Sequence, residues 1–98
     1  MFCRASRCQT SPESLAEIAR IFKEQAGPLV SRQPGFKGWY LMTKPNGEFM
    51  TLSIWDTEEQ ANAWYQNPEH HQMVAQLTPL LSGAPARDGY EVLAHAVA

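Results

Sequence analysis

Two adjacent histidines, His70 and His71, have side chains whose chemistry suggests a function. Histidine titrates near neutral pH, which suits a general base. Pro68 predicts a helix start here, and neighbouring helical side chains point about 100° apart, so only one histidine can face a given pocket. Because the sequence has no His-x-x-x-His or Cys-x-x-Cys spacing, no metal site is expected. His95, near the end of the chain, is interpreted as structural.

Aromatic side chains form the second candidate set. The chain has three tryptophans, three tyrosines and four phenylalanines in 98 residues. Each ring could stack on a flat ligand or simply fill the core, and the core is the favoured interpretation for Trp55. Asn62 lies in the same region, and its amide could donate a hydrogen bond to a ligand or lie solvated on a helix. The candidate ring-stacking residues are Trp39, Tyr40, Trp55, Trp64 and Tyr65.

The two cysteines and the glycines fit none of the common reactive motifs. Cys3 and Cys8 are five residues apart, so in a strand they would lie on opposite faces and could not form a disulfide. They are interpreted as reduced thiols. The sequence has no glycine-rich dinucleotide or phosphate loop and no Gly-x-Ser-x-Gly elbow.

Composition limits the classes of function. A chain of 98 residues makes one domain, here residues 1–98. The formal net charge of −2 and the scattered Lys and Arg residues argue against nucleic-acid binding. No apolar stretch approaches the roughly 20 residues that a membrane helix needs, and the first residues lack the apolar core of a signal peptide. A cytoplasmic protein is therefore expected.

Four segments show the character of strands, and these are the elements that must position the candidate residues. Each is short and bounded by turn residues. Lys44-Pro45-Asn46-Gly47 predicts a tight hairpin between the middle two segments, because Asn-Gly tolerates the positive φ of such turns. The predicted strands are residues 1–9, 36–43, 48–55 and 89–97.

Helices are predicted in the two longer connections. Thr10-Ser11-Pro12-Glu13 is typical of a helix start, and Gly27-Pro28 predicts a kink or a break in that helix. A second helix is expected to begin with Asp56 as its cap, with Glu59 reaching back to it. It is expected to end near Asn67-Pro68. A third helix then begins, with inward residues Met73, Val74, Leu77 and Leu81.

The order strand, helix, strand, strand, helix, strand predicts an α+β fold. The expected architecture is a ferredoxin-like βαββαβ unit, a four-stranded antiparallel sheet with helices on one face. In the third strand Met50, Leu52 and Ile54 are expected to face the helices, with Phe49 and Trp55 on the other side. Both faces are then apolar, and the chain has no spare helix to cover the second. A homodimer formed through the sheet faces is therefore predicted.

Several short segments resemble the antibiotic-biosynthesis-monooxygenase family of dimeric α/β barrels. They follow one another with similar order and spacing over almost the whole chain. The resemblance implies the same ferredoxin-like fold and dimer. The matching segments are Gln33-Pro34-Gly35-Phe36-Lys37-Gly38, Ser53-Ile54-Trp55-Asp56, Trp64 and Pro68-Glu69-His70.

The resemblance also implies a monooxygenase reaction without a metal or organic cofactor. A phenol or hydroquinone is deprotonated, its anion transfers an electron to oxygen, and a carbon-bound peroxide loses water to give a quinone. Such chemistry needs a dry pocket for a flat ring, a hydrogen-bond donor where charge develops, and a base. His70 is the expected base and Asn62 the expected donor. The residues expected to hold the small aromatic substrate are Trp39, Tyr40, Trp64 and Tyr65.

Two alternatives remain open on sequence grounds. A haem-degrading branch of the family resembles this chain at Trp55 and Trp64. That branch has an asparagine on the first strand and a haem-ligating histidine about ten residues after the helix tryptophan, where this chain has Ser6 and Val74. The other alternative is a dimer that binds a small ligand, or is purely structural, without catalysis.

Overall fold

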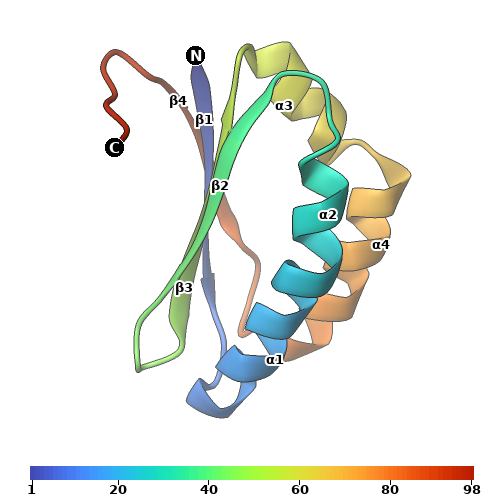
Figure 1. Cartoon of the computed structure of the whole chain (residues 1–98). Helices are drawn as coiled ribbons and strands as arrows, with labels where there is room; N and C mark the ends of the chain where they lie inside the picture. The colour runs from blue at the N-terminus through green and yellow to red at the C-terminus, as the bar shows by residue number, and fades with distance from the viewer.

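Four strands form one antiparallel sheet, and helices cover one of its faces (Figure 1). The computed structural model describes residues 1–98. The strand order across the sheet is β2-β3-β1-β4, so the predicted α+β, ferredoxin-like arrangement is confirmed. The strands are β1 (Phe2–Gln9), β2 (Phe36–Thr43), β3 (Glu48–Trp55) and β4 (Ala86–Glu91).

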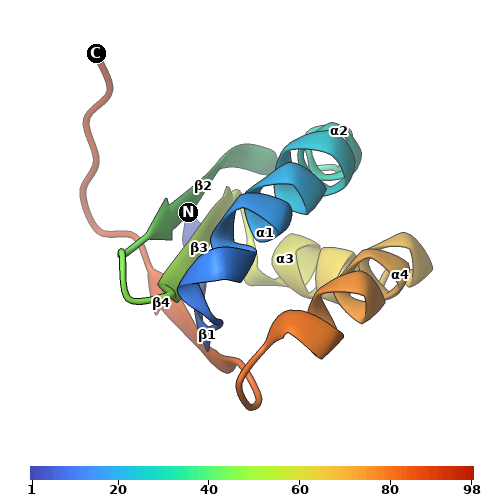
Figure 2. The same ribbon diagram turned by 90° about the horizontal axis from the view of Figure 1, so that it is seen from below.

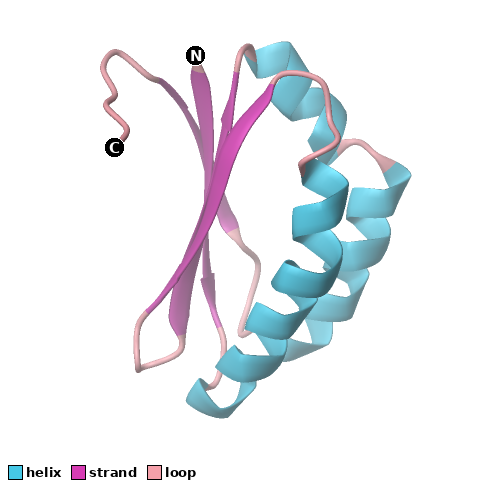
Figure 3. Cartoon of the chain, in the orientation of Figure 1, coloured by secondary structure: helices cyan, strands magenta, loops and turns pink.

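The helical layer has two arms that run side by side over the same face of the sheet (Figures 2 and 3). Gln25 and Gln76 join the arms through two reciprocal side-chain hydrogen bonds of 2.9 and 2.6 Å. The first arm comprises η1 (Pro12–Ser14), α1 (Leu15–Ile21), η2 (Phe22–Ala26) and α2 (Gly27–Val30), and the second comprises α3 (Glu58–Tyr65), α4 (Pro68–Leu77) and η3 (Thr78–Leu80).

The irregularity expected at Gly27-Pro28 takes the form of a π-helical turn. The amide of Gly27 donates to the carbonyl of Phe22, five residues earlier, instead of to the residue four before it. Pro28 has no N–H, and in a regular α-helix its ring would clash with the carbonyl of Glu24. The widened turn, η2, lets the arm continue into α2 without a break.

The predicted inner and outer faces of β3 are the wrong way round. Phe49 and Trp55 are buried beneath the helices, whereas Met50, Leu52 and Ile54 are only half-buried on the open face. Each of the two aromatic rings offers more apolar area to the core than any one of Met50, Leu52 and Ile54, and both rings lie on the inner face. The inner positions between them are therefore occupied by small hydroxyl residues.

The start of α3 lies one residue later than predicted. Thr57 is the N-cap: its side chain accepts from the amide of Gln60, and the Gln60 side chain accepts from the Thr57 amide, both at 3.2 Å. This is a complete capping box. Asp56 lies instead 3.4 Å from the Lys37 ammonium, so the carboxylate that suggested a cap pairs with β2.

The last strand begins and ends earlier than predicted. β4 spans Ala86–Glu91, and it pairs with β1 over Phe2 to Arg7. Because β1 begins at Phe2, the chain beyond Val92 has no strand beside it. The apolar run that suggested a strand to residue 97 is exposed, as at Leu93 and Val97.

The core consists of two clusters at opposite ends of the inner face. One is formed by the first arm and α4 against Phe49, and the other is formed by Trp55 with the ends of both arms. Trp55 is fully buried, as the sequence interpretation favoured. The clusters contain Ile18, Ile21, Phe22, Ala26, Phe49, Met73 and Leu77 in the first, and Phe2, Val30, Trp55, Ala61 and Trp64 in the second.

The face of the sheet opposite the helices carries large apolar side chains. Tyr40, Met42 and Tyr90 are exposed there, and Leu52 and Ile54 are half-buried. The sheet is therefore apolar on both faces, as the sequence indicates. No helix of the chain has the length and apolar character needed to cross a membrane.

Candidate active site

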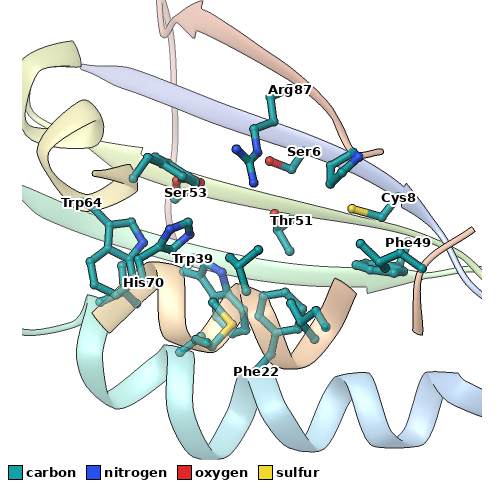
Figure 4. A pocket seen from close by; sticks show the side chains of 18 residues that line it. Ser6, Cys8, Phe22, Trp39, Phe49, Thr51, Ser53, Trp64, His70 and Arg87 are labelled. Atoms are coloured by element: carbon teal, nitrogen blue, oxygen red, sulfur yellow. Dashed lines mark hydrogen bonds between the residues drawn. The ribbon is translucent and has the colours of Figure 1, made fainter. Parts of the chain in front are cut away.

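A small cavity lies between the inner face of the sheet and the two helical arms (Figure 4). Its volume is about 60 Å³, and two thirds of its 18 lining residues are hydrophobic. Residues of both core clusters form its walls, and inward side chains of β1 and β3 form its floor. The lining residues used below are Ser6, Cys8, Trp39, Thr51, Ser53, Trp64, Tyr65, His70 and Arg87.

His70 packs between two aromatic rings at one end of the cavity. Its ring centroid is 5.0 Å from that of Trp64 and 4.8 Å from that of Tyr65, both in edge-on arrangements. The short turn between α3 and α4 makes this contact possible, because Asn67 caps α4 and Pro68 begins it immediately. His70 is therefore only 6% exposed although it lies in the first turn of a helix.

The buried imidazole of His70 lacks a hydrogen-bond partner at Nδ1. Burial lowers the pKa of His70 to about 4, and the positive charge of Arg87, followed by that of His71, adds to this shift. The imidazole is therefore neutral at physiological pH. His71 is exposed, and its Nε2 lies 2.9 Å from the carbonyl oxygen of Tyr65, so only His70 lines the cavity.

Tyr65 connects the cavity floor to two arginines. Its hydroxyl lies 3.2 Å from Oγ of Ser53, and the guanidinium carbons of Arg4 and Arg87 lie 5.7 and 5.8 Å from its ring centroid. Both distances are within the range of cation–π attraction. Burial raises the pKa of Tyr65, against the opposing effects of Ser53, Arg87 and Arg4, so the hydroxyl remains protonated and can donate a hydrogen bond.

Arg87 is a cavity residue that sequence reasoning missed. It lies on β4 directly opposite Ser6 of β1, with its side chain on the helical side of the sheet. The predicted strand began only at Gly89, which left Arg87 in a loop. The alternation of side chains along a strand is the signal that could have found it. Once β4 is known to begin at Ala86, opposite Arg7, its next residue, Arg87, must face the same side of the sheet as Ser6.

The structure brings four of the six predicted site residues together. Trp39, Trp64, Tyr65 and His70 all line the cavity. Asn62 does not: it is exposed, and its Oδ1 accepts a 2.6 Å hydrogen bond from the Arg4 guanidinium.

Tyr40 also lies away from the cavity. It is 60% exposed on the open face of the sheet, because its neighbour Trp39 faces the helices. Of the two cysteines, Cys8 lines the cavity and Cys3 faces the opposite side, as their spacing predicts. Burial raises the pKa of both thiols.

An open groove adjoins the cavity. It has a volume of about 400 Å³ and shares Val74, Leu81, Pro85 and Arg87 with the cavity lining. The enclosed part alone is smaller than the roughly 150 Å³ cavity that binds benzene in an engineered protein. A flat ring would therefore lie across cavity and groove, or displace the segment around Pro85. No group of three His, Cys, Asp or Glu side chains is placed so that it could hold a metal ion.

Comparison with known proteins agrees with this architecture. The family model of the antibiotic biosynthesis monooxygenases matches residues 1–76. The chain belongs to this family. No curated protein matches the sequence.

Three solved structures are similar over nearly their whole length. Protein NE2512 of Nitrosomonas europaea, of unknown function, has a TM-score of 0.83 at 21% identity, with 99% of this chain and 93% of that chain covered. Rv0793 of Mycobacterium tuberculosis has a TM-score of 0.79 at 15% identity, with 98% of each chain covered. SnoaB of Streptomyces nogalater, a cofactor-independent oxygenase, has a TM-score of 0.79 at 16% identity, with 96% and 94% covered. At these identities the likeness shows the fold.

The depressed pKa of His70 predicts a specific dependence of stability on pH. The histidine is neutral in the folded chain above about pH 4 but binds a proton below about pH 6.5 in the unfolded chain. The unfolded state therefore binds more protons between these values, and the free energy of unfolding should fall as the pH is lowered from 6.5 to 4. His70 should contribute at most about 3 kcal/mol to this fall.

Urea unfolding at a series of pH values measures this effect. His70→Phe keeps an aromatic ring between Trp64 and Tyr65 and should flatten the dependence in this window. His95→Phe changes a histidine in the exposed C-terminal segment and should not. Equal slopes in wild type and His70→Phe would contradict the buried, neutral histidine.

Proposed function

We propose that this protein is a cofactor-independent monooxygenase that oxidises a phenolic or hydroquinone-type aromatic substrate with molecular oxygen. The observation that carries the proposal is the buried, unpartnered imidazole of His70 in an apolar cavity that also contains the cation of Arg87. Family membership and the similar fold of SnoaB, a cofactor-independent oxygenase, support it.

In the proposed reaction the substrate supplies all the electrons. Loss of the phenolic proton gives an anion, which transfers one electron to O₂, and the two radicals combine at a ring carbon that bears hydrogen. The peroxide anion takes back the phenolic proton and then loses water, formed from its terminal OH and that hydrogen, and the carbon becomes a carbonyl. One phenol and one O₂ thus give one quinone and one water, and no external reductant is consumed.

His70 and Arg87 share the deprotonation step in this proposal. An imidazole with a pKa near 4 is a weak base toward a phenol, whose pKa is about 10. A cation next to the phenol favours the phenolate and lowers the phenol pKa. The phenolate in turn offsets the charge of Arg87 and raises the pKa of His70. The pair can therefore hold the transferred proton and the new negative charge together.

The remaining predicted residues receive direct or indirect roles. Trp39, Trp64 and Tyr65 hold the ring, since all three line the cavity. Asn62 acts indirectly: it binds Arg4, whose guanidinium carbon lies 5.7 Å from the centroid of the Tyr65 ring. Tyr40 belongs to the open face and contributes to subunit contact.

The haem-degrading alternative finds less support than oxygenation without a cofactor. Val74, at the position where the resembling branch has its haem-ligating histidine, lines the cavity with an aliphatic side chain. His70 is the one histidine among the lining residues, and it lies six residues after Trp64, not about ten.

We also propose a homodimer in the cytoplasm. The exposed apolar face that includes Tyr40, Met42 and Tyr90 suits contact with the same face of a second copy, and the free thiols of Cys3 and Cys8 suit a reducing compartment.

Oxygen uptake with simple hydroquinones and phenols tests the activity. We expect wild type to consume O₂ in equimolar amounts with quinone formation, measured with an oxygen electrode and by absorbance. His70→Phe should lower the rate by about 10²-fold, as loss of a general base does. The histidine is buried, so a variant that preserves the ring is used to keep the core filled. Tight ligand binding without O₂ uptake would favour a non-catalytic binding protein.

The pH dependence of kcat/KM tests the coupling of Arg87 to His70. Wild-type activity should persist to about pH 5 and be lost near pH 4, because the base is neutral above its pKa. Arg87→Gln removes a charge that lowers this pKa, so its acid limb should move to higher pH. Arg32→Gln, a change at an exposed arginine in the turn after α2, is the matched control. If the acid limb of Arg87→Gln stayed at the wild-type pH, the charge of Arg87 would not act on the pKa of the catalytic base.

Sedimentation at micromolar concentration tests the dimer. An obligate interface of this type buries on the order of 2,000 Å² or more. Wild type should sediment as a dimer, and Leu52→Glu, which places a charge in the centre of the open face, should shift it toward monomer. A monomeric wild type would contradict the proposed assembly.

A further inference from the structure

A cross-strand row of polar side chains occupies the middle of the cavity floor. Thr51 of β3 pairs directly with Ser6 of β1, and Ser6 pairs directly with Arg87 of β4. Side chains at directly opposed positions lie about 4.5–5.5 Å apart at their Cβ atoms. All three line the cavity, and Figure 4 shows them above its apolar wall of helical residues.

The two hydroxyl groups of this row have no partner within the chain. Ser6 and Thr51 are only 7% and 8% exposed. The hydroxyl of neighbouring Ser53 is paired with Tyr65, but those of Ser6 and Thr51 make no such bond. Only two side-chain polar atoms are both fully buried and without a partner, namely Trp55 Nε1 and His70 Nδ1. The hydroxyl oxygens of Ser6 and Thr51 are therefore not fully enclosed, and both reach the cavity space. Burying a hydroxyl without a hydrogen bond is costly, and a ligand oxygen would remove that cost.

The side chains of this row can bind an electron-rich oxygen of a ligand, such as a carbonyl or phenolate oxygen. Two O–H groups can donate, and the guanidinium adds donors and a positive charge. No Asp or Glu lines the cavity, so nothing in the lining neutralises Arg87. Thr51 is two residues from Ser53, which places the row about 7 Å from the Ser53–Tyr65 pair along the strand.

We propose that the hydroxyls of Thr51 and Ser6 form a second polar subsite that binds an oxygen substituent at the far end of the substrate ring system. The ligand is then an aromatic compound with two oxygen substituents, one beside His70, Tyr65 and Arg87 and the other on these two hydroxyls. The inference rests on the proposed function, which places the substrate ring beside His70. It adds a polar subsite that distinguishes substrates with a second oxygen from those without one.

Two stable probes separate the subsite from the rest of the cavity. 1-Naphthol has one hydroxyl group on its ring system, and naphthalene-1,5-diol has a second hydroxyl at the opposite end. Binding can be followed by quenching of the tryptophan fluorescence, since Trp39 and Trp64 line the cavity. We expect wild type to bind the diol about tenfold more tightly, as one or two additional hydrogen bonds allow.

Substitutions at Thr51 provide the matched set. Thr51→Val keeps the shape and removes the hydroxyl, so the preference for the diol should disappear while the affinity for 1-naphthol stays within about twofold. Thr51→Ser keeps the hydroxyl and should keep the preference. Ser6→Ala should behave as Thr51→Val does. Thr43→Val makes the same chemical change at an exposed residue of β2 and should have no effect.

Each outcome decides between the two proposals. Equal affinities of wild type for the two probes, or a preference retained in both Thr51→Val and Ser6→Ala, would overturn the subsite and leave the proposed oxygenase standing. Loss of the preference in these variants, in a protein that consumes no O₂, would establish the subsite and refute the oxygenase. If wild type bound neither probe, the cavity would not be an aromatic site and both would fail. A melting curve for each variant separates loss of binding from loss of fold.

Discussion

Two buried aromatic rings on one strand determine how far the helices lie from the sheet. Phe49 and Trp55 are six residues apart on β3, about 20 Å, and each anchors one of the two core clusters. The inner positions between them are Thr51 and Ser53, whose side chains are much smaller than the two rings. The arms rest on the rings at both ends, and the space between them stays open as the cavity. The polar floor and the apolar walls of the site both follow from this spacing.

The fold could be predicted from the sequence because it depends on the order and length of elements. The hairpin at Asn46-Gly47 and the capped helices define that order through local interactions. The direction of β3 was harder, because both parities are apolar and the decision depends on which residues pack against helices elsewhere in the chain. Alternation alone does not contain that information. The one-residue error at Asp56 has a similar origin, since its carboxylate pairs with Lys37 on another strand.

Most of the correctly predicted site residues are close in sequence, and Trp39 on β2 was chosen for its ring alone. Trp64, Tyr65 and His70 lie within one helix–turn–helix segment, and local geometry brings them together. Arg87 reaches the same cavity through strand pairing with β1, and the sequence gives no direct indication of that pairing. Asn62 shows the opposite case: it lies close to Tyr65 in sequence, yet it turns outward to Arg4. Local proximity therefore predicted the ring-binding end and missed the cation.

The π-helical turn η2 affects the rotational phase of the first arm. A regular α-helix advances about 100° per residue, and the extra residue in the widened turn offsets everything that follows by that amount. Phe22 and Ala26, at the two ends of η2, and Val30 beyond it all line the cavity. If the same residues formed a regular α-helix, Val30 would be rotated by about 100° away from the cavity. The local irregularity of this helix is thus the condition under which both of its halves face the same cavity.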